Sequence, residues 1–208
     1  MSIVKLSNNG VKNATAFGSI SSLGSMTFIK KLTASASATL SFVDGSDGVV
    51  LDDTYKEYVF TFNNIHPATN NTNFTFNASN DDSSHSYDVI KTTTQFRSLH
   101  AEANNDTNLQ YFGSQDLAQS SAFQTLISEI GNENDETASG YLNLFNPSST
   151  TFVKHYMSRL NSYASFDYSI EQYSAGYFND GSNDLTAIQF KMSSGNIDAG
   201  DICLYGIA

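Results

Sequence analysis

The segment Tyr58-Val59-Phe60-Thr61-Phe62 decides the fold class of this 208-residue chain. Its aromatic side chains recur at every second position, and residues two apart lie on the same face of an extended chain. The segment therefore predicts a strand that buries one aromatic face. The run Asn63-Asn64-Ile65-His66-Pro67 follows, and we expect it to end the strand, because proline supplies no N–H to a sheet.

Short alternating stretches of the same kind recur along the chain, and clusters of Gly, Asn, Asp, Ser or Pro separate them. About eight or nine short strands with turns between them are typical of an antiparallel all-β domain. We therefore predict an antiparallel β-sandwich, jelly-roll-like, that residues 26–208 form as a single domain. The other expected strands include residues 74–76, 89–99, 141–145, 152–160, 188–192 and 202–205.

Residues 117–130 fit two patterns. Leu117, Phe123, Leu126 and Ile130 have the spacing of a helical stripe, while residues 126–130 also alternate as a strand does. We favour a short turn or helix that leads into a strand.

Residues 193–196, Ser-Ser-Gly-Asn, are the last turn cluster. Glycine and asparagine tolerate positive φ, so this cluster predicts the turn of a closing hairpin. Ile197, Ile202 and Leu204 are expected in the core. Cys203 lies among them, and we interpret it as a buried, inert thiol.

Residues 1–25 are small and polar, with few apolar side chains. Ordering the backbone of each residue costs about 1–2 kcal/mol, which so few apolar groups do not offset. We therefore predict an extended N-terminal arm that becomes ordered only against a neighbouring subunit. Its expected anchors are Ile3, Val4, Leu6 and Val11.

The charge balance restricts the possible partners. The chain has 10 Lys and Arg against 21 Asp and Glu, a formal net charge of −11. Nucleic-acid backbones and anionic membranes attract clustered cations, so we expect neither as a partner. The first residues do not resemble a signal peptide, and we expect synthesis in a cytoplasm.

Residues that carry chemistry are scattered. His66, His85, His100 and His155 lack the spacing of a zinc site, and no nucleophile elbow or phosphate loop occurs. We expect no catalytic residues, no cofactor and no metal. The acidic turns have ligands suited to calcium, but we favour solvated turns. These turns contain Asp44, Asp47, Asp52, Asp53, residues 132–136, Asp180 and Asp184.

Residues 161–184 are rich in Tyr, Ser and Asn, and no strand is assigned to them. Tyrosine combines a large rigid area with a polar tip, which suits interfaces and sugar stacking. Tyr163, Tyr168, Tyr173 and Tyr177 are therefore the candidate contact surface. The alternative is that half of them point into the core.

Three stretches together resemble a family of tailed-phage virion proteins, abundant in phages of marine cyanobacteria. They are residues 58–69, residues 140–148 (Gly-Tyr-Leu-Asn-Leu-Phe-Asn-Pro-Ser), and residues 188–207, which contain the motif Ser-Ser-Gly-Asn-Ile at 193–197 and end in Leu-Tyr-Gly-Ile. The resemblance implies a β-sandwich that is part of the particle and carries no known catalytic residues. The sequence departs from the family at 81–84, where Asp-Asp-Ser-Ser replaces a glycine-rich turn.

Two functions are consistent with these observations. The first is a non-enzymatic virion structural protein, either a capsid decoration or a tail-appendage component, that assembles as a homo-oligomer, for example a trimer, with other virion proteins. The second is a carbohydrate- or receptor-binding module of a tail fibre or tip, with a host-surface glycan as its partner. A glycosidase ranks third.

Overall fold

The structure is a computed structural model and describes residues 25–208. All regular structure in that range is β-strand, so the described residues contain no helix of the length and apolarity that would cross a membrane. The strands are β1 (Met26–Thr33), β2 (Leu40–Val43), β3 (Glu57–Pro67), β4 (Thr72–Ser79), β5 (Lys91–Ala101), β6 (Thr107–Tyr111), β7 (Gln124–Ile130), β8 (Ala138–Phe145), β9 (Lys154–Ala164), β10 (Tyr168–Phe178), β11 (Ala187–Met192) and β12 (Ile197–Ile207).

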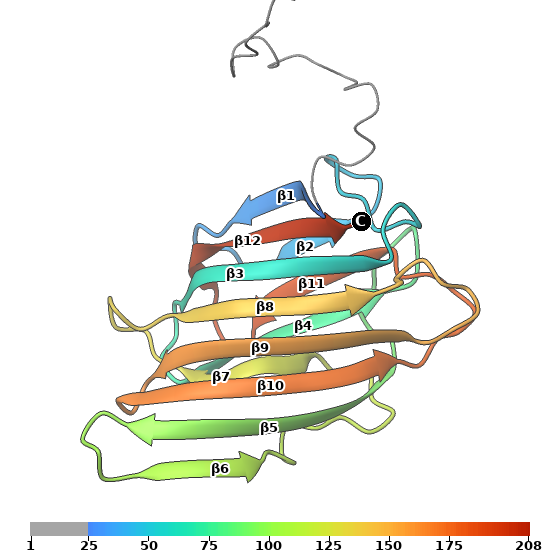
Figure 1. The fold of residues 1–208 in the computed structure, drawn as a ribbon. Coiled ribbons are helices and arrows are strands. Elements are labelled where there is room, and N and C mark those ends of the chain that lie inside the picture. Colours follow the sequence, from blue (N-terminus) through green and yellow to red (C-terminus); the bar gives the residue numbers. More distant parts are fainter. Residues whose placement is uncertain (1–24) are drawn as a thin grey trace, which may run out of the picture.

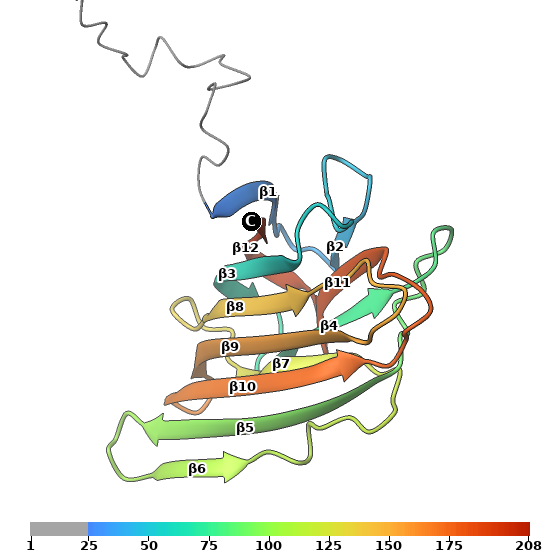
Figure 2. The same ribbon diagram turned by 45° about the vertical axis from the view of Figure 1, so that its right-hand side comes forward.

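The strands form one antiparallel sheet that folds over on itself into two layers (Figure 1). The front layer has the order β1-β12-β3-β8-β9-β10-β5-β6, and the back layer has the order β7-β4-β11-β2. A single residue pair, Ile130 with Ala164, joins β7 to β9 where the layers meet. Figure 2 shows the back layer behind the upper and middle part of the front one. The prediction of an antiparallel all-β sandwich is confirmed.

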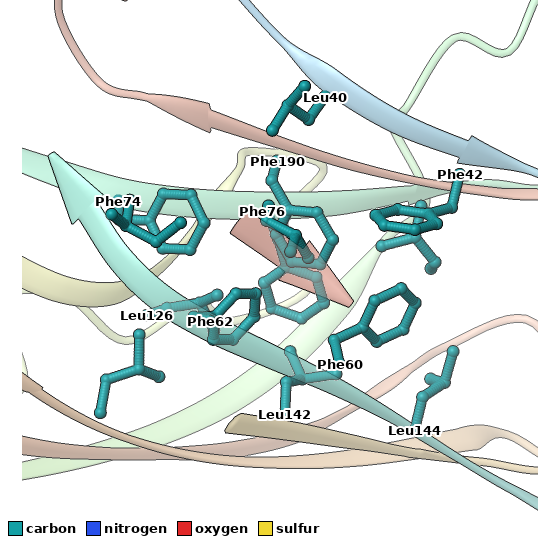
Figure 3. Close-up of a cluster of buried hydrophobic side chains, with 14 of the residues drawn as sticks. Leu40, Phe42, Phe60, Phe62, Phe74, Phe76, Leu126, Leu142, Leu144 and Phe190 are labelled. Atoms are coloured by element: carbon teal, nitrogen blue, oxygen red, sulfur yellow. The ribbon is translucent and has the colours of Figure 1, made fainter. Parts of the chain in front are cut away.

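The core lies between β3 and β8 in front and β2, β4 and β11 behind (Figure 3). Tyr58, Phe60 and Phe62 are at most 1% exposed, so the predicted aromatic face of the strand is buried. The rings of Phe60 and Phe62 each contact Phe190 edge to face, with centroids 5.3 Å apart. Such aromatic pairs contribute about 0.5–1.5 kcal/mol beyond the area they bury.

The C-terminal motif has a different role from the one expected. β11 pairs with β2 and β4, while β12 pairs with β1 and β3, so residues 193–196 connect the two layers and do not close a hairpin. Gly195 adopts φ +71°, and a Cβ there would lie 2.2 Å from Thr69 Oγ1. Ile197, Ile202 and Leu204 are fully buried, as predicted, and Cys203 is also buried.

The expected boundaries are confirmed only in part. Residues 117–123 form bends and a single bridge at Ser120, with no helix, and lead into β7, so the predicted turn that leads into a strand is confirmed. β3 continues past Asn63-Asn64 through a bulge after Phe62 and ends at Pro67, so the proline ends the strand as expected and the asparagines do not. β10 lies within residues 161–184, for which no strand was predicted. Its inward side carries the polar residues Gln172 and Ser174, so the alternation of apolar and polar residues that indicates a strand is weak there. The predicted arm, apart from Ser25, lies outside the described residues.

Candidate binding surface

The outward face of the front layer carries the candidate surface, and none of the strands among residues 25–208 covers it. Side chains of β9 and β10 alternate between the two faces, as in any strand. On β9 the residues with even numbers are buried from Lys154 to Ala164. Arg159 and Met157 therefore point to the outside, and Tyr173 does the same on β10.

A row of large side chains crosses this face from β8 to β6. Its members stand directly opposite one another in successive strand pairs, and we call the row the outer ridge. Phe96, Tyr111 and Tyr141 are 45%, 66% and 43% exposed, respectively. The outer ridge consists of Tyr141 (β8), Arg159 (β9), Tyr173 (β10), Phe96 (β5) and Tyr111 (β6).

The rings in the middle of the outer ridge pack against their neighbours on adjacent strands. Phe96 and Tyr173 are stacked, with centroids 4.6 Å apart and an interplanar angle of 8°. On the side of β9, the guanidinium of Arg159 lies 5.3 Å from the centroid of Tyr173 and forms an ion pair of 2.5 Å with Glu171. Both faces of the Tyr173 ring are therefore covered, and the outer ridge presents ring edges to a partner.

A shallow groove of about 250 Å³ lies beside the outer ridge. Ala175 is the small outward residue of β10 at this place, and its neighbours Thr94 and Met157 also line the groove. His155 and Tyr177 border it with rings 6.1 Å apart in an edge-to-face arrangement. The groove thus has a mostly apolar lining with an aromatic wall.

The four predicted tyrosines do not share one side. Tyr163, Tyr173 and Tyr177 follow the outward alternation, while Tyr168 packs against the core. Tyr168 donates a hydrogen bond to Asp106 over 3.1 Å, which raises the pKa of the phenol. Partial burial and the carboxylates of Glu102 and Asp167 raise the pKa of Tyr163 to about 12. The predicted arm anchors Ile3, Val4, Leu6 and Val11 lie outside the described residues.

Most residues of the outer ridge were not predicted from the sequence. Phe96, Tyr111, Tyr141 and Arg159 come from strands far apart along the chain, and only strand register aligns them with Tyr173. No local motif marks such a row. Exposed aromatic residues at alternating positions of polar strands were the one available signal.

A polar layer behind the outer ridge fixes the orientation of β5. Thr93 donates to the Gln124 side chain over 2.6 Å, and Gln95 donates to the carbonyl of Thr125 over 2.7 Å. Arg97 donates to Ser128 and to Glu129, over 3.1 Å and 2.5 Å. Buried polar groups are costly without such partners. These bonds tie β5 to β7 and direct Phe96 outward. The layer comprises Thr93, Gln95, Arg97, Gln124, Thr125, Ser128, Glu129 and Gln172.

Two fully buried lysines extend this interior. Lys91 Nζ donates to the carbonyls of Val89 and Ala122 over 3.1 Å and 2.7 Å, and burial lowers its pKa to about 7. Lys154 Nζ donates to the carbonyls of Asp180 and Asn183. β9 directs Lys154 inward and His155 and Arg159 outward, so these three residues, which lie close together in the sequence, do not form one cluster.

Some carboxylates in the turns accept hydrogen bonds within the chain, as Asp44 does from Leu51 N–H and Asp52 from Thr54 N–H. Asp81 accepts hydrogen bonds from the N–H groups of Ser84, His85 and Ser86, which hold its pKa far below the usual range. Burial raises the pKa of Asp180, but hydrogen bonds from its neighbours outweigh burial and lower that pKa to about 2. Within residues 25–208, no three His, Cys, Asp or Glu side chains come together as a potential metal site.

Comparison with family models, with curated proteins and with solved structures gave no match to this chain.

Proposed function

We propose that this chain is a non-enzymatic structural protein of a bacteriophage virion, a capsid decoration or tail-appendage component that binds copies of itself and other particle proteins. The outer ridge carries the proposal. It places aromatic residues and one arginine in line on a sheet face that no described strand covers. Tyr and Arg are among the residues that contribute most to protein–protein interfaces.

The geometry of the outer ridge favours a protein partner over a flat ligand. Tyr173 is held between Phe96 and Arg159, so its ring faces are not free for stacking. The exposed edges of such rings can insert between the side chains of an opposing protein surface and bury area on both sides. The polar layer behind β5 keeps these rings in place, which lowers the entropic cost of binding.

The C-terminal motif supports the assignment to a virion. Residues 193–207 resemble phage particle proteins, and here the motif leads the chain from the back layer into β12 of the front layer. Its apolar positions Ile197, Ile202 and Leu204 are fully buried. The motif thus has a structural role that a family of particle proteins would share. Synthesis in the host cytoplasm followed by incorporation into the virion is part of the proposal.

Purified particles of the virus that encodes this chain test the proposal. Mass spectrometry should find the chain at a copy number that matches a symmetric structural component, and a particle reconstruction should place it. The double variant Phe96→Ala/Tyr173→Ala should be incorporated at least tenfold less than the wild type. The control Asn63→Ala, at an exposed residue of β3, should be incorporated normally. Absence of the chain from purified particles contradicts the proposal.

The groove beside Ala175 supports a second candidate, a module that binds a neutral host-surface glycan. Tyr177 and His155 form an aromatic wall, and Thr94, whose side chain carries a hydroxyl, also lines the groove. Titration with host polysaccharide should give a micromolar dissociation constant that Tyr177→Ala weakens at least tenfold. If wild type and Tyr177→Ala bind equally, or neither binds, this candidate is wrong.

A further inference from the structure

β6 is an edge strand without the usual protection. Among residues 25–208 it pairs only with β5, and its sequence Thr-Asn-Leu-Gln-Tyr contains no charged residue and no proline. Leu109 and Tyr111 are 74% and 66% exposed. Natural sheets protect their edges with charges, prolines, bulges or very short strands, because a free edge recruits another strand.

The other two ends of the sheet do carry such protection. β1 has Lys30 and Lys31 and a bulge after Phe28, and β2 has only 4 residues. The open edge at β6 is therefore a local property of this strand and not a general feature of the fold.

The hydrogen bonds between β5 and β6 show which backbone N–H and C=O groups of β6 point away from β5. Asp106 and Phe112 exchange backbone bonds with β5, through Ala101 N–H to Asp106 and Phe112 N–H to Gln95. Because successive residues of a strand direct their N–H and C=O to opposite sides, residues 108 and 110 also face β5. The backbone groups of Thr107, Leu109 and Tyr111 therefore point away from the sheet.

We propose that β6 pairs with β6 of a second copy of this chain, antiparallel and with Leu109 opposite Leu109 at a two-fold axis. In this register Thr107 of one copy lies opposite Tyr111 of the other. Each outward N–H and C=O of residues 107, 109 and 111 then has a partner in the other copy. A two-fold interface must be complementary to itself, and this register fulfils that condition along the entire strand.

The charge of the chain and the common face of the outer ridges support a second copy of this chain as the partner of β6. Each copy carries a net charge of −11, so like copies repel one another except where a neutral surface meets a neutral surface. The five residues of β6 form such an uncharged stretch, which Asp106 and Asp116 flank. The pairing also places the outer ridges of both copies on the same side of one continuous sheet, because Phe96 and Tyr111 share that face. The inference rests on the self-assembly part of the proposed function and names its interface.

A cysteine cross-link tests the register directly. Opposed residues of a hydrogen-bonded antiparallel pair have Cα atoms about 5.5 Å apart, within the range of about 4.4–6.8 Å that a disulfide spans. The full chain with Leu109→Cys should form a covalent dimer upon mild oxidation or with a short bismaleimide. The wild type, whose single cysteine Cys203 is buried, and the variant Asn63→Cys should stay largely uncrosslinked under the same conditions.

Two substitutions test whether the pairing holds the copies together in solution. Leu109→Pro removes an N–H that points away from β5, and Leu109→Lys adds a protecting charge to the edge. Each should weaken dimerisation at least tenfold in sedimentation equilibrium, whereas Asn63→Lys should not. Circular dichroism identifies a Leu109→Pro chain that fails to fold, and in that case Leu109→Lys decides.

Several outcomes overturn this inference. They are a wild type that stays monomeric at all concentrations, a dimer that both Leu109 variants leave intact, and a dimer that only Phe96→Ala/Tyr173→Ala disrupts. A dimer that cross-links at Leu109 in a protein absent from virions would leave the β6 interface standing while the virion proposal fails. A protein that is present in virions but does not cross-link at Leu109 would overturn the β6 interface and leave the virion proposal standing.

Discussion

Phe96 of β5 and Tyr173 of β10 lie opposite each other in register and stack with ring centroids 4.6 Å apart on the exposed side of the sheet. Their neighbours in sequence, Gln95, Arg97 and Gln172, are buried. β5 thus differs from an ordinary half-buried strand, because its interior side is mainly polar while the large apolar ring of Phe96 lies on its exterior side. Because the interior hydrogen bonds fix this orientation, the exposed rings are held in place for a partner.

The Phe96–Tyr173 stack should be measurable as a coupling energy. Each ring is partly exposed, so Phe96→Ala or Tyr173→Ala should reduce the free energy of unfolding by less than a core truncation does. A double-mutant cycle by urea denaturation should give a coupling of about 0.5–1.5 kcal/mol between the two residues. Additive effects of the two substitutions would show that the rings do not support each other.

Truncation of the strand that decides the fold should be far more costly. Phe60 is fully buried and contacts Phe42 and Phe190 edge to face. Phe60→Ala removes these contacts and leaves a cavity, so the free energy of unfolding should fall by about 3–5 kcal/mol. Val59→Ala on the other face of β3 should cost clearly less. A loss below about 1 kcal/mol for Phe60→Ala would mean that the core is packed differently.

The buried Lys91 should make stability depend on pH. Burial lowers its pKa from 10.5 to about 7, so between these values the unfolded chain binds a proton that the folded chain does not. Stability should therefore rise with pH between 7 and 10 by up to about 1.4 kcal/mol per pH unit, and the contribution should be constant below pH 7.

Unfolding by urea at a series of pH values isolates this contribution. The difference between wild type and Lys91→Met should change with pH across that window. The exposed Lys56→Met should give a constant difference. A difference between wild type and Lys91→Met that stays the same from pH 6 to 10 would show that Lys91 is protonated in the folded state.

Residues before β1 are predicted to act in assembly and not in folding. A chain that begins at Ser25 should keep its melting temperature, because β1 to β12 already enclose the core. It should lose higher-order assembly, since Ile3, Val4, Leu6 and Val11 are the predicted anchors in a neighbour, while the β6 pair should persist. Calorimetry and light scattering measure the two effects separately. If the truncated chain unfolds, these residues belong to the domain itself.

The sequence by itself determined the strands whose burial can be recognised locally. At residues 58–62 and at Ile202 and Leu204, large apolar side chains recur at every second position. The free energy gained by removing these side chains from water is sufficient to determine which face of the strand is buried. For such segments the hydrophobic effect needs no information about the partner strand. The all-β class, the central strand and the buried positions of the C-terminal motif followed from this pattern.

Only the tertiary structure decided the orientation of β5 and β10 and the existence of the outer ridge. Distant residues of the chain accept hydrogen bonds from Lys91 Nζ, Gln95 Nε2 and Arg97 Nη1, while Gln95 Oε1 and Arg97 Nε have no partner among the described residues. Burial of a polar group depends on such a partner, and the partner depends on long-range strand pairing, which local alternation does not encode. The same holds for Phe96, Tyr173 and Arg159, which become neighbours only through strand register.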